Sequence, residues 1–233
     1  MSIPKNRPPL AAPKRGHYFD PVPEAASKPR TLHLHIGDLA LELEADRGVF
    51  GSRAIDLGTR TLLKEAPLPP PEGDLLDLGS GYGPIAIALA RRSPAAKVWA
   101  VDVNERALQL TRANAAAAKT LNVVASLPDE VPPEVRFAAI YSNPPVRVGK
   151  GPLHDLLERW LPRLAPGANA YLVVQRNLGS DSLAAWLAAQ GYSVQRLKSK
   201  KGYRVLSVTA GAQHQSAEGA TATPILRSDP AST

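Results

Sequence analysis

Apolar residues fall on alternate positions from Thr31 to Ala45, in the segment TLHLHIGDLALELEA. Gly37-Asp38 interrupts the alternation halfway along the segment. Alternation of this kind predicts two half-buried strands, and a dipeptide that begins with glycine predicts a tight hairpin turn between them. A short helix is predicted next, from about Leu57 to Ala66, so that residues from about 30 to 66 form an N-terminal extension.

From Asp74 onward, short apolar runs alternate with segments of helical periodicity. Strands are predicted at DLLDLGS, KVWAVDV, NVVAS, FAAIYSN, NAYLVVQ, YSVQRLKS and YRVLSVT, and helices at PIAIALARRS, ERALQLTRANAAAA, His154–Leu164 and SDSLAAWLAAQ. This order predicts right-handed crossovers and a mostly parallel sheet, with the last two strands as antiparallel neighbours. The predicted fold is therefore α/β: a Rossmann-like open sheet, mostly parallel with an antiparallel last strand, preceded by the N-terminal β-hairpin.

The two ends of the chain differ in composition from the part between them. Residues 1–16 are rich in proline and basic residues and contain no acid, which predicts a disordered basic arm. Residues 211–233 lack periodicity and predict a disordered tail, which leaves 17–210 as the folded domain. The apolar runs are too short to cross a bilayer, and no apolar signal segment begins the chain, so we expect a cytoplasmic protein without a membrane partner.

The overall charge favours a polyanionic partner. The formal net charge is +7 and the isoelectric point is about 9.8, which points to nucleic acid before an anionic membrane. The chain contains no cysteine, which excludes disulfides, thiolate metal sites and cysteine nucleophiles. No metal site is expected. The basic segment RLKSKKGYR near the C-terminus is also typical of a sheet edge protected against aggregation.

A glycine-rich loop, LLDLGSGYGP, follows the first predicted strand of the sheet. Dinucleotide-binding loops read G-x-G-x-x-G and hold a pyrophosphate, whereas this loop reads G-x-G-x-G and is preceded by Asp77. A carboxylate at this point would repel a pyrophosphate and attract an ammonium group, while Asp102 after the next strand could accept the hydroxyls of a ribose. The pattern favours S-adenosylmethionine over a nicotinamide cofactor; a plain strand-to-helix turn with a surface Asp is the alternative.

The dipeptide Pro144-Pro145 follows Asn143 at the end of the fourth of these strands. Proline lacks a backbone donor, so the rigid turn leaves acceptors free to hold a planar NH2 group. Such an amine is a poor nucleophile, and acceptors on both of its hydrogens would direct its lone pair at an electrophile. The alternative is a strand that ends at a proline with an Asx turn.

The motifs DLGSGYG, AVDVN and SNPP resemble class I S-adenosylmethionine-dependent methyltransferases that modify exocyclic or amide nitrogen. GVFGSRAIDLGTRTLL, NPPVRVGKGPLHDLLERW, LVVQRNLG and KSKKGYRVLSV are similar to ribosomal RNA guanine-N2 methyltransferases of the small-subunit methyltransferase C type. The resemblance runs from about His17 to Thr209. Members of that family often carry a second, degenerate N-terminal methyltransferase copy, for which this chain has no room.

The resemblance implies a role for individual residues of the cofactor site. Asp77, Gly79 and Gly81 would hold the methionine end, Asp102 the ribose, Val103 or Asn104 the adenine, and Ser126 the adenine amine. Phe50 would either border the cofactor pocket or lie buried beneath the short helix that follows it. Asn143, Pro144 and Pro145 would hold the target amine as the catalytic group.

The expected RNA contacts lie on both sides of the catalytic motif. Arg147, Lys150 and His154 would meet phosphates, and Tyr18 and Phe19 would either stack on a base or anchor the basic arm. Val146 stands where related nitrogen methyltransferases have an aromatic that stacks on the base.

These observations predict a monomeric methyltransferase that acts on guanine N2 of ribosomal RNA, free or within an assembled ribosomal subunit. Protein-glutamine and DNA adenine-N6 methyltransferases remain alternatives, since their substrates also present a planar NH2. A catalytically silent RNA-binding or ribosome assembly factor is the alternative of another class, and a dehydrogenase is more distant.

Overall fold

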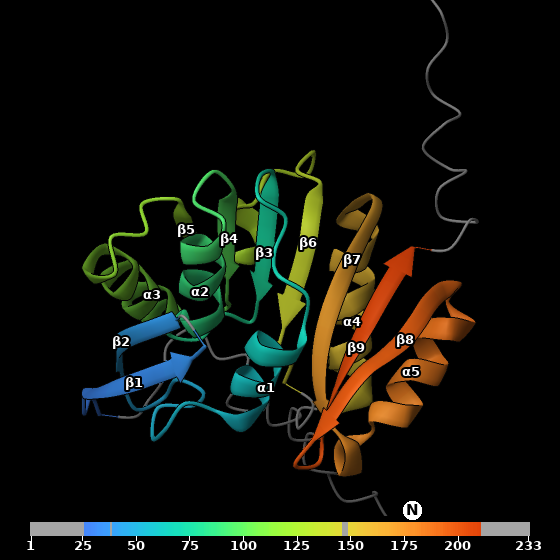
Figure 1. The fold of residues 1–233 in the computed structure, drawn as a ribbon, viewed down its shortest axis with the longest axis horizontal. Helices are drawn as coiled ribbons and strands as arrows, with labels where there is room; N and C mark the ends of the chain where they lie inside the picture. Colours follow the sequence, from blue (N-terminus) through green and yellow to red (C-terminus); the bar gives the residue numbers. More distant parts are fainter. Residues whose placement is uncertain (1–25, 38, 146–148, 211–233) are drawn as a thin grey trace, which may run out of the picture.

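The computed structural model describes residues 26–37, 39–145 and 149–210 (Figure 1). The predicted arm and tail therefore lie outside the described residues. The strands of the main sheet are β3 (Asp74–Leu78), β4 (Lys97–Val101), β5 (Val123–Ser126), β6 (Phe137–Ser142), β7 (Leu164–Gln175), β8 (Tyr192–Lys200) and β9 (Tyr203–Ala210). The α-helices are α1 (Leu57–Glu65), α2 (Pro84–Arg92), α3 (Glu105–Ala117), α4 (Lys150–Trp160) and α5 (Ser180–Ala189). A separate two-stranded sheet consists of β1 (Arg30–Ile36) and β2 (Leu39–Ala45).

The main sheet has seven strands in the order β5-β4-β3-β6-β7-β9-β8. The five strands β3 to β7 pair in parallel, whereas β9 is antiparallel to both β7 and β8. The predicted fold class is therefore confirmed. Because β4 lies on one side of β3 and β6 on the other, the chain reverses its direction of winding at β3, and such a reversal opens a crevice at the carboxyl ends of the strands.

Two layers of side chains cover the sheet, because its central strands are apolar on both faces. Leu75 of β3 and Tyr141 of β6 belong to a core shared with the hairpin, α1, α2 and α3. Leu76 and Ile140, which point the opposite way, belong to a core shared with α4 and α5. Figure 1 shows the hairpin and α1 on one side of the sheet and α4 and α5 behind it.

The predicted hairpin is present, and its register pairs Leu34 with Leu41. Gly37 has a φ of 57°, in the left-handed region that the turn requires. Asn114 of α3 accepts from the Glu44 amide at 2.7 Å and donates to the Glu44 carbonyl at 2.8 Å, which fixes the hairpin against the main domain.

One predicted helix is displaced. The helix expected around His154–Leu164 begins four residues earlier, at Lys150, and ends at Trp160. Pro152 lies in the first turn, where the missing amide has no helical partner to lose, so it does not prevent the earlier start. Pro162 cannot continue the α-helical hydrogen bonds, and residues Leu161–Arg163 form a 3-10 turn before β7. Among the described helices, none combines the length and the apolarity needed to cross a membrane.

Candidate functional site

The glycine-rich loop turns sharply between β3 and α2. The amides of Gly79 and Ser80 donate to the Val101 carbonyl, at 2.8 and 3.0 Å. Gly79, Gly81 and Gly83 all have positive φ, at 76°, 57° and 88°. A Cβ at Gly83 would also lie only 3.0 Å from the Thr111 side chain, so the positive φ and this close contact both favour glycine there.

Asp77 lies beneath this loop and is completely buried. Its Oδ2 accepts from the Ala86 amide of α2 at 2.8 Å, whereas its Oδ1 has no hydrogen-bond partner within the part of the chain that the structure describes. Burial and, less strongly, the nearby Asp102 carboxylate together raise the pKa of Asp77 to about 8, against the opposing effect of the Ala86 amide. An acceptor left unpaired in the interior is costly, and a cation placed at the loop would satisfy it. The ammonium group of an amino acid fits this requirement.

Asp102 links the glycine loop to the start of α3. Its Oδ2 accepts from the Gly81 amide at 2.8 Å, and its Oδ1 accepts from the Asn104 amide at 3.0 Å. Burial raises the pKa of the Asp102 carboxyl, although these amides oppose the shift. Each carboxylate oxygen still has a lone pair to spare, so the side chain can accept the two hydroxyls of a ribose.

The other residues assigned to the cofactor lie along the same edge of the sheet. Asn104 caps α3 by accepting from the amides of Arg106 and Ala107, and its Nδ2 donates to the Gly48 carbonyl at 3.0 Å. Val103 is half-buried beside it. Ser126 is buried at the end of β5, where its carbonyl accepts from the Asp102 amide at 3.4 Å. The Asn104 side chain thus joins the start of α3 to Gly48, and the adenine contacts expected of Val103, Asn104 and Ser126 stay predictions.

Asn143 follows β6 on the other side of β3. Its Nδ2 donates to Asp56 Oδ1 at 2.7 Å and to Thr59 Oγ1 at 3.2 Å. Since both hydrogens of the amide are used in this way, the side-chain Oδ1 is left as an acceptor. Ser142, just before it, donates to the Leu78 carbonyl at 2.7 Å and ties the end of β6 to the end of β3. Pro144 is buried and Pro145 is half-buried.

Three residues near Asn143 did not emerge from the sequence as site residues: Asp56, Gly58 and Thr59. Asp56 caps α1, and its Oδ1 accepts from Gly58, Thr59 and Asn143 together. A Cβ on Gly58 would lie 2.9 Å from the Tyr203 ring and 3.0 Å from Asn143 Oδ1, so this position is closed to any larger residue. The signal in the sequence was an Asp directly before a predicted helix, which indicates a cap but not a distant partner.

The glycine loop and Asn143 line one narrow crevice, together with Phe50, Asp56 and Thr59. Its volume is about 20 Å³, which is room for about one water molecule. Phe50 is 53% exposed at the edge of the crevice, so the alternative that it lies buried under α1 is wrong. In this state the crevice is too small to hold a nucleoside.

The residues assigned to RNA are more scattered. Lys150 is exposed at the start of α4. His154 is half-buried, and its ring stacks on Trp186 of α5 with centroids 3.8 Å apart and planes 5° apart. Tyr18, Phe19, Val146 and Arg147 lie outside the described residues. The predicted RNA contacts of these residues stay predictions.

Comparison with known proteins relates the chain to methyltransferases. The family described as "Methyltransferase small domain" matches residues 40–207. A Bacillus subtilis protein named "Uncharacterized protein YbxB" is 32% identical over 82% of this chain and 96% of its own length. "Ribosomal RNA small subunit methyltransferase C" of Pseudomonas aeruginosa (strain LESB58) is 33% identical over 67% of this chain and 51% of its own length.

A solved structure of a ribosomal RNA methyltransferase is also similar to this chain. The "16S rRNA N2 G1207 methyltransferase (RsmC)" of T. Thermophilus, in complex with AdoMet and guanosine, matches with a TM-score of 0.66 and 25% identity over 81% of this chain and 52% of that one. The chain therefore spans only about half the length of the ribosomal RNA methyltransferases to which it is similar, whereas it spans nearly all of the Bacillus protein.

Proposed function

Because the chain belongs to the methyltransferase small domain family, we propose that it transfers a methyl group from S-adenosylmethionine to the N2 amine of a guanine in ribosomal RNA. The observation that carries this proposal is the hydrogen bonding of the Asn143 side chain. Its amide hydrogens are held by Asp56 and Thr59, its Oδ1 is left as an acceptor, and the residue lines the same crevice as the glycine loop. An acceptor for an amine thus adjoins the place that suits the cofactor.

The residues present fit the cofactor. Asp77 Oδ1, buried and unpaired in the described structure, would accept from its ammonium group, and Asp102 would accept from the ribose hydroxyls. Gly79 and Gly81 keep the loop free of side chains where the methionine end would lie. S-adenosylmethionine supplies a methyl group on a positively charged sulfur, which is an electrophile.

On the substrate side, Asn143 would act on an amine that is a weak nucleophile. The lone pair of the guanine N2 is delocalised into the ring, and positive charge develops on nitrogen as the new bond forms. Asn143 Oδ1 and the carbonyls at Pro144 and Pro145 would accept from its hydrogens and stabilise that charge. Positioning supplies much of the rate gain, and no strong base is needed.

Ribosomal RNA is favoured over the other substrates that present a planar NH2. The names of the relatives and of the protein in the matching structure support it, as does the net charge of +7. A glutamine amide or an adenine N6 would meet the same acceptors, so the choice among these substrates rests on those relatives and on the charge.

Two substitutions separate the cofactor half of the site from the amine half. Asn143→Ala should lower methyl transfer by about 100-fold or more, as the loss of an electrostatic stabiliser does, while S-adenosylmethionine affinity stays within about threefold. Asp102→Ala should weaken cofactor affinity by about tenfold or more. Isothermal titration and a methyl-transfer assay on ribosomal RNA measure the two effects.

Asn122→Ala is the matched control, because the Asn122 amide bonds to Ser93 and Ala96 at the other end of the sheet. It should leave both quantities nearly unchanged. Parallel loss of cofactor binding in Asn143→Ala would contradict the division of roles. A wild-type protein that binds no S-adenosylmethionine would favour the silent RNA-binding factor.

A further inference from the structure

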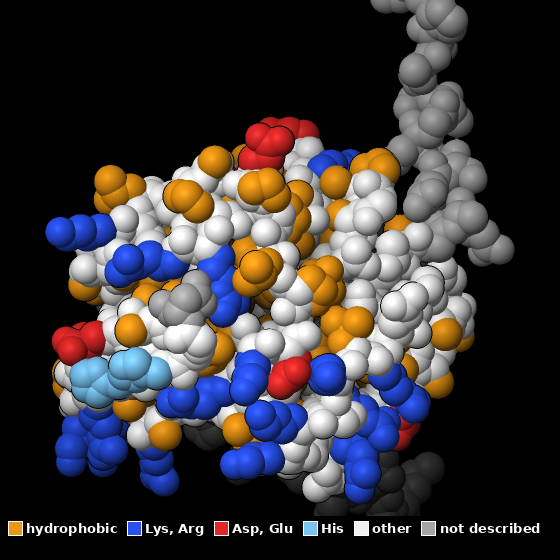
Figure 2. All heavy atoms as spheres, in the orientation of Figure 1, with side chains coloured by type: hydrophobic (Ala, Val, Ile, Leu, Met, Phe, Trp, Pro, Cys, Tyr) orange, Lys and Arg blue, Asp and Glu red, His pale blue; other side chains and the backbone are white. Residues whose placement is uncertain are grey.

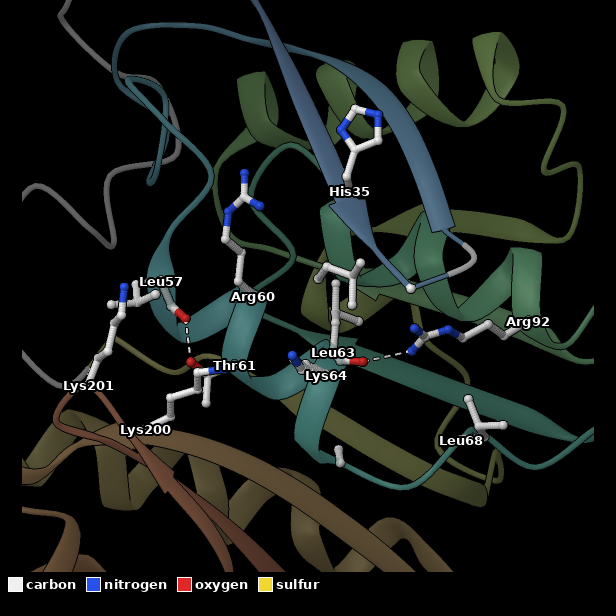
Figure 3. A pocket seen from close by; sticks show the side chains of 13 residues that line it. His35, Leu57, Arg60, Thr61, Leu63, Lys64, Leu68, Arg92, Lys200 and Lys201 are labelled. Carbon is white, nitrogen blue, oxygen red and sulfur yellow. Dashed lines mark hydrogen bonds between the residues drawn. The ribbon is translucent and has the colours of Figure 1, made fainter.

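A second cavity, far larger than the crevice at Asn143, lies between the β1–β2 hairpin, α1 and the turn that joins β8 to β9. Its volume is about 590 Å³. We call it the basic groove, after the basic side chains that line it: His35, Arg60, Lys64, Arg92, Lys200 and Lys201. Figure 3 shows these side chains reaching the groove from the hairpin, from two helices and from the β8–β9 turn.

The lining of the groove concentrates basic side chains. None of the described residues that line it is Asp or Glu. Within the described ranges, no ion pair joins any of the six side chains to a carboxylate. Arg196 and Arg204, which belong to the same basic segment of the sequence as Lys200, instead both pair with Asp181. Like charges that converge without partners repel each other, and a polyanion would relieve that repulsion.

Protection of a sheet edge accounts for only part of this charge. Lysines on an edge strand oppose aggregation, and Lys200 ends the edge strand β8. Arg60 and Lys64, however, lie on α1, and Arg92 ends α2. Cations from helices that have no unpaired strand edge to protect require another explanation.

The arginines have donors to spare. Arg60 donates once, to the His33 carbonyl at 3.3 Å, and Arg92 donates to the Leu63 carbonyl at 2.9 Å. The Arg92 Nε is buried and has no partner among the described residues. A guanidinium carries five donors, and phosphate oxygens are well matched to those left over.

Helix α1 connects the groove to the candidate active site. Asp56 and Thr59 at its start hold Asn143, whereas Leu57, Arg60 and Lys64 face the groove. Tyr203, which follows the β8–β9 turn, comes close to Gly58 at the same end of α1. The helix has nine residues and is about 14 Å long. The groove thus follows α1 from Leu57, the residue after Asp56, and its lining includes Arg92 of α2.

We propose that the basic groove binds the phosphodiester backbone of an RNA strand next to the target nucleotide. This inference rests on the proposed function, since it takes RNA as the substrate. Figure 2 shows Lys and Arg side chains gathered over the hairpin, α1 and the β8–β9 turn on this face. The groove is concave, which suits a strand better than it suits a flat bilayer surface. Leu57 and Leu63 give it an apolar floor against which a sugar can pack.

The test compares two triple variants of the full chain that lose the same charge. The groove variant carries Arg60→Ala, Lys64→Ala and Lys200→Ala. The control variant carries Lys97→Ala, Arg136→Ala and Arg159→Ala, three exposed cations away from α1 and the hairpin. Fluorescence anisotropy with a labelled, short single-stranded RNA oligonucleotide, across a salt series and without cofactor, measures the affinity.

The groove variant should bind this RNA at least about tenfold more weakly at low salt, and its plot of log affinity against log salt should be shallower by about 2, because each phosphate contact on a single strand contributes roughly 0.7. The control variant should stay within about threefold of wild type. Unchanged RNA binding in the groove variant, or equal losses in both variants, would overturn the proposal. So would binding of inorganic phosphate that depends on the groove while RNA binding does not.

This outcome is independent of the test of catalysis. Binding of the oligonucleotide is measured without methyl transfer, so an inactive protein would still give a readable result. Conversely, methyl transfer by the wild-type protein could still be observed if the groove proved not to bind RNA. S-adenosylmethionine affinity should be equal in the wild type and in both variants.

Discussion

At the scale of single residues, one oxygen atom of Asp56 organises the amine half of the site. Asp56 Oδ1 caps α1 through the amides of Gly58 and Thr59 and also receives the Asn143 side chain. A cap of this kind ordinarily stabilises the start of a helix. Here it also accepts from the Asn143 amide nitrogen, and so leaves Asn143 Oδ1 as the free acceptor.

The buried Asp77 makes cofactor binding depend on pH. Burial raises the pKa of its carboxyl to about 8, so below that pH the free protein holds it protonated. An ammonium group at Oδ1 favours the ionised form, so binding should release a proton and affinity should rise with pH. Between about pH 5.5 and 7 the amino group of the cofactor stays charged, since such groups titrate near 8. The expected rise approaches tenfold per pH unit.

Isothermal titration in buffers of different ionisation enthalpy measures both the affinity and the released proton. Asp77→Asn should bind S-adenosylmethionine more weakly, and most of the pH dependence should disappear. A wild-type affinity that stays flat from pH 5.5 to 7, with no proton release, would show that Asp77 does not receive the ammonium.

The sequence indicated Asn143, Asp77 and Asp102 because each lies at the end of a predicted strand, and Asp77 and Asn143 also adjoin a glycine or proline motif. It did not indicate the partners of Asn143. Asp56 and Thr59 lie 87 and 84 positions away along the chain, so only folding brings them together. The contribution of Tyr203 beside Gly58 was hidden for the same reason.

At the scale of elements, the segment between β2 and α1 controls access to the crevice. The Gly48 carbonyl is held by Asn104, and the Arg47 carbonyl accepts from Arg106 at 2.9 Å. The other end of the segment is fixed by Asp56 at α1. Phe50 and Gly51 lie between these attachments and line a crevice of only about 20 Å³.

Cofactor binding should therefore change the backbone of residues 50–54. Outward movement admits S-adenosylmethionine, and contact with the bound molecule then protects the amides of the segment. Hydrogen–deuterium exchange should slow in 50–54 and in the glycine loop when the cofactor is added, whereas the hairpin Arg30–Ala45 serves as an internal control and should not change. Protection confined to the glycine loop would mean that this segment does not cover the cofactor.

Most helices and strands could be predicted from the spacing of apolar residues, because the alternating and helical patterns differ clearly in this chain. The exception was α4, which begins four residues before its predicted start at His154. Proline at position 152 is compatible with the first turn of a helix and equally with a segment before it. Local pattern alone does not distinguish those two positions.

At the scale of the whole molecule, the order of strands places three of the predicted motifs at the carboxyl ends of neighbouring strands. The glycine loop, Asp102 and Asn143 follow β3, β4 and β6, which are neighbours in the sheet. That neighbourhood could be predicted, since strands alternating with helices imply a parallel sheet. The basic groove could not, because its cations come from β1, α1, α2 and β8, and only their packing shows that they converge.

The central claim concerns the product of the reaction, and mapping methylated guanines in ribosomal RNA tests it most directly. Ribosomal RNA from a strain that lacks this protein should be analysed by mass spectrometry beside RNA from the same strain complemented with the wild-type chain or with Asn143→Ala. We predict that one N2-methylguanosine disappears, returns with the wild-type chain, and stays absent with Asn143→Ala. An N2-methylguanosine map that is unchanged in the absence of the protein would contradict the account.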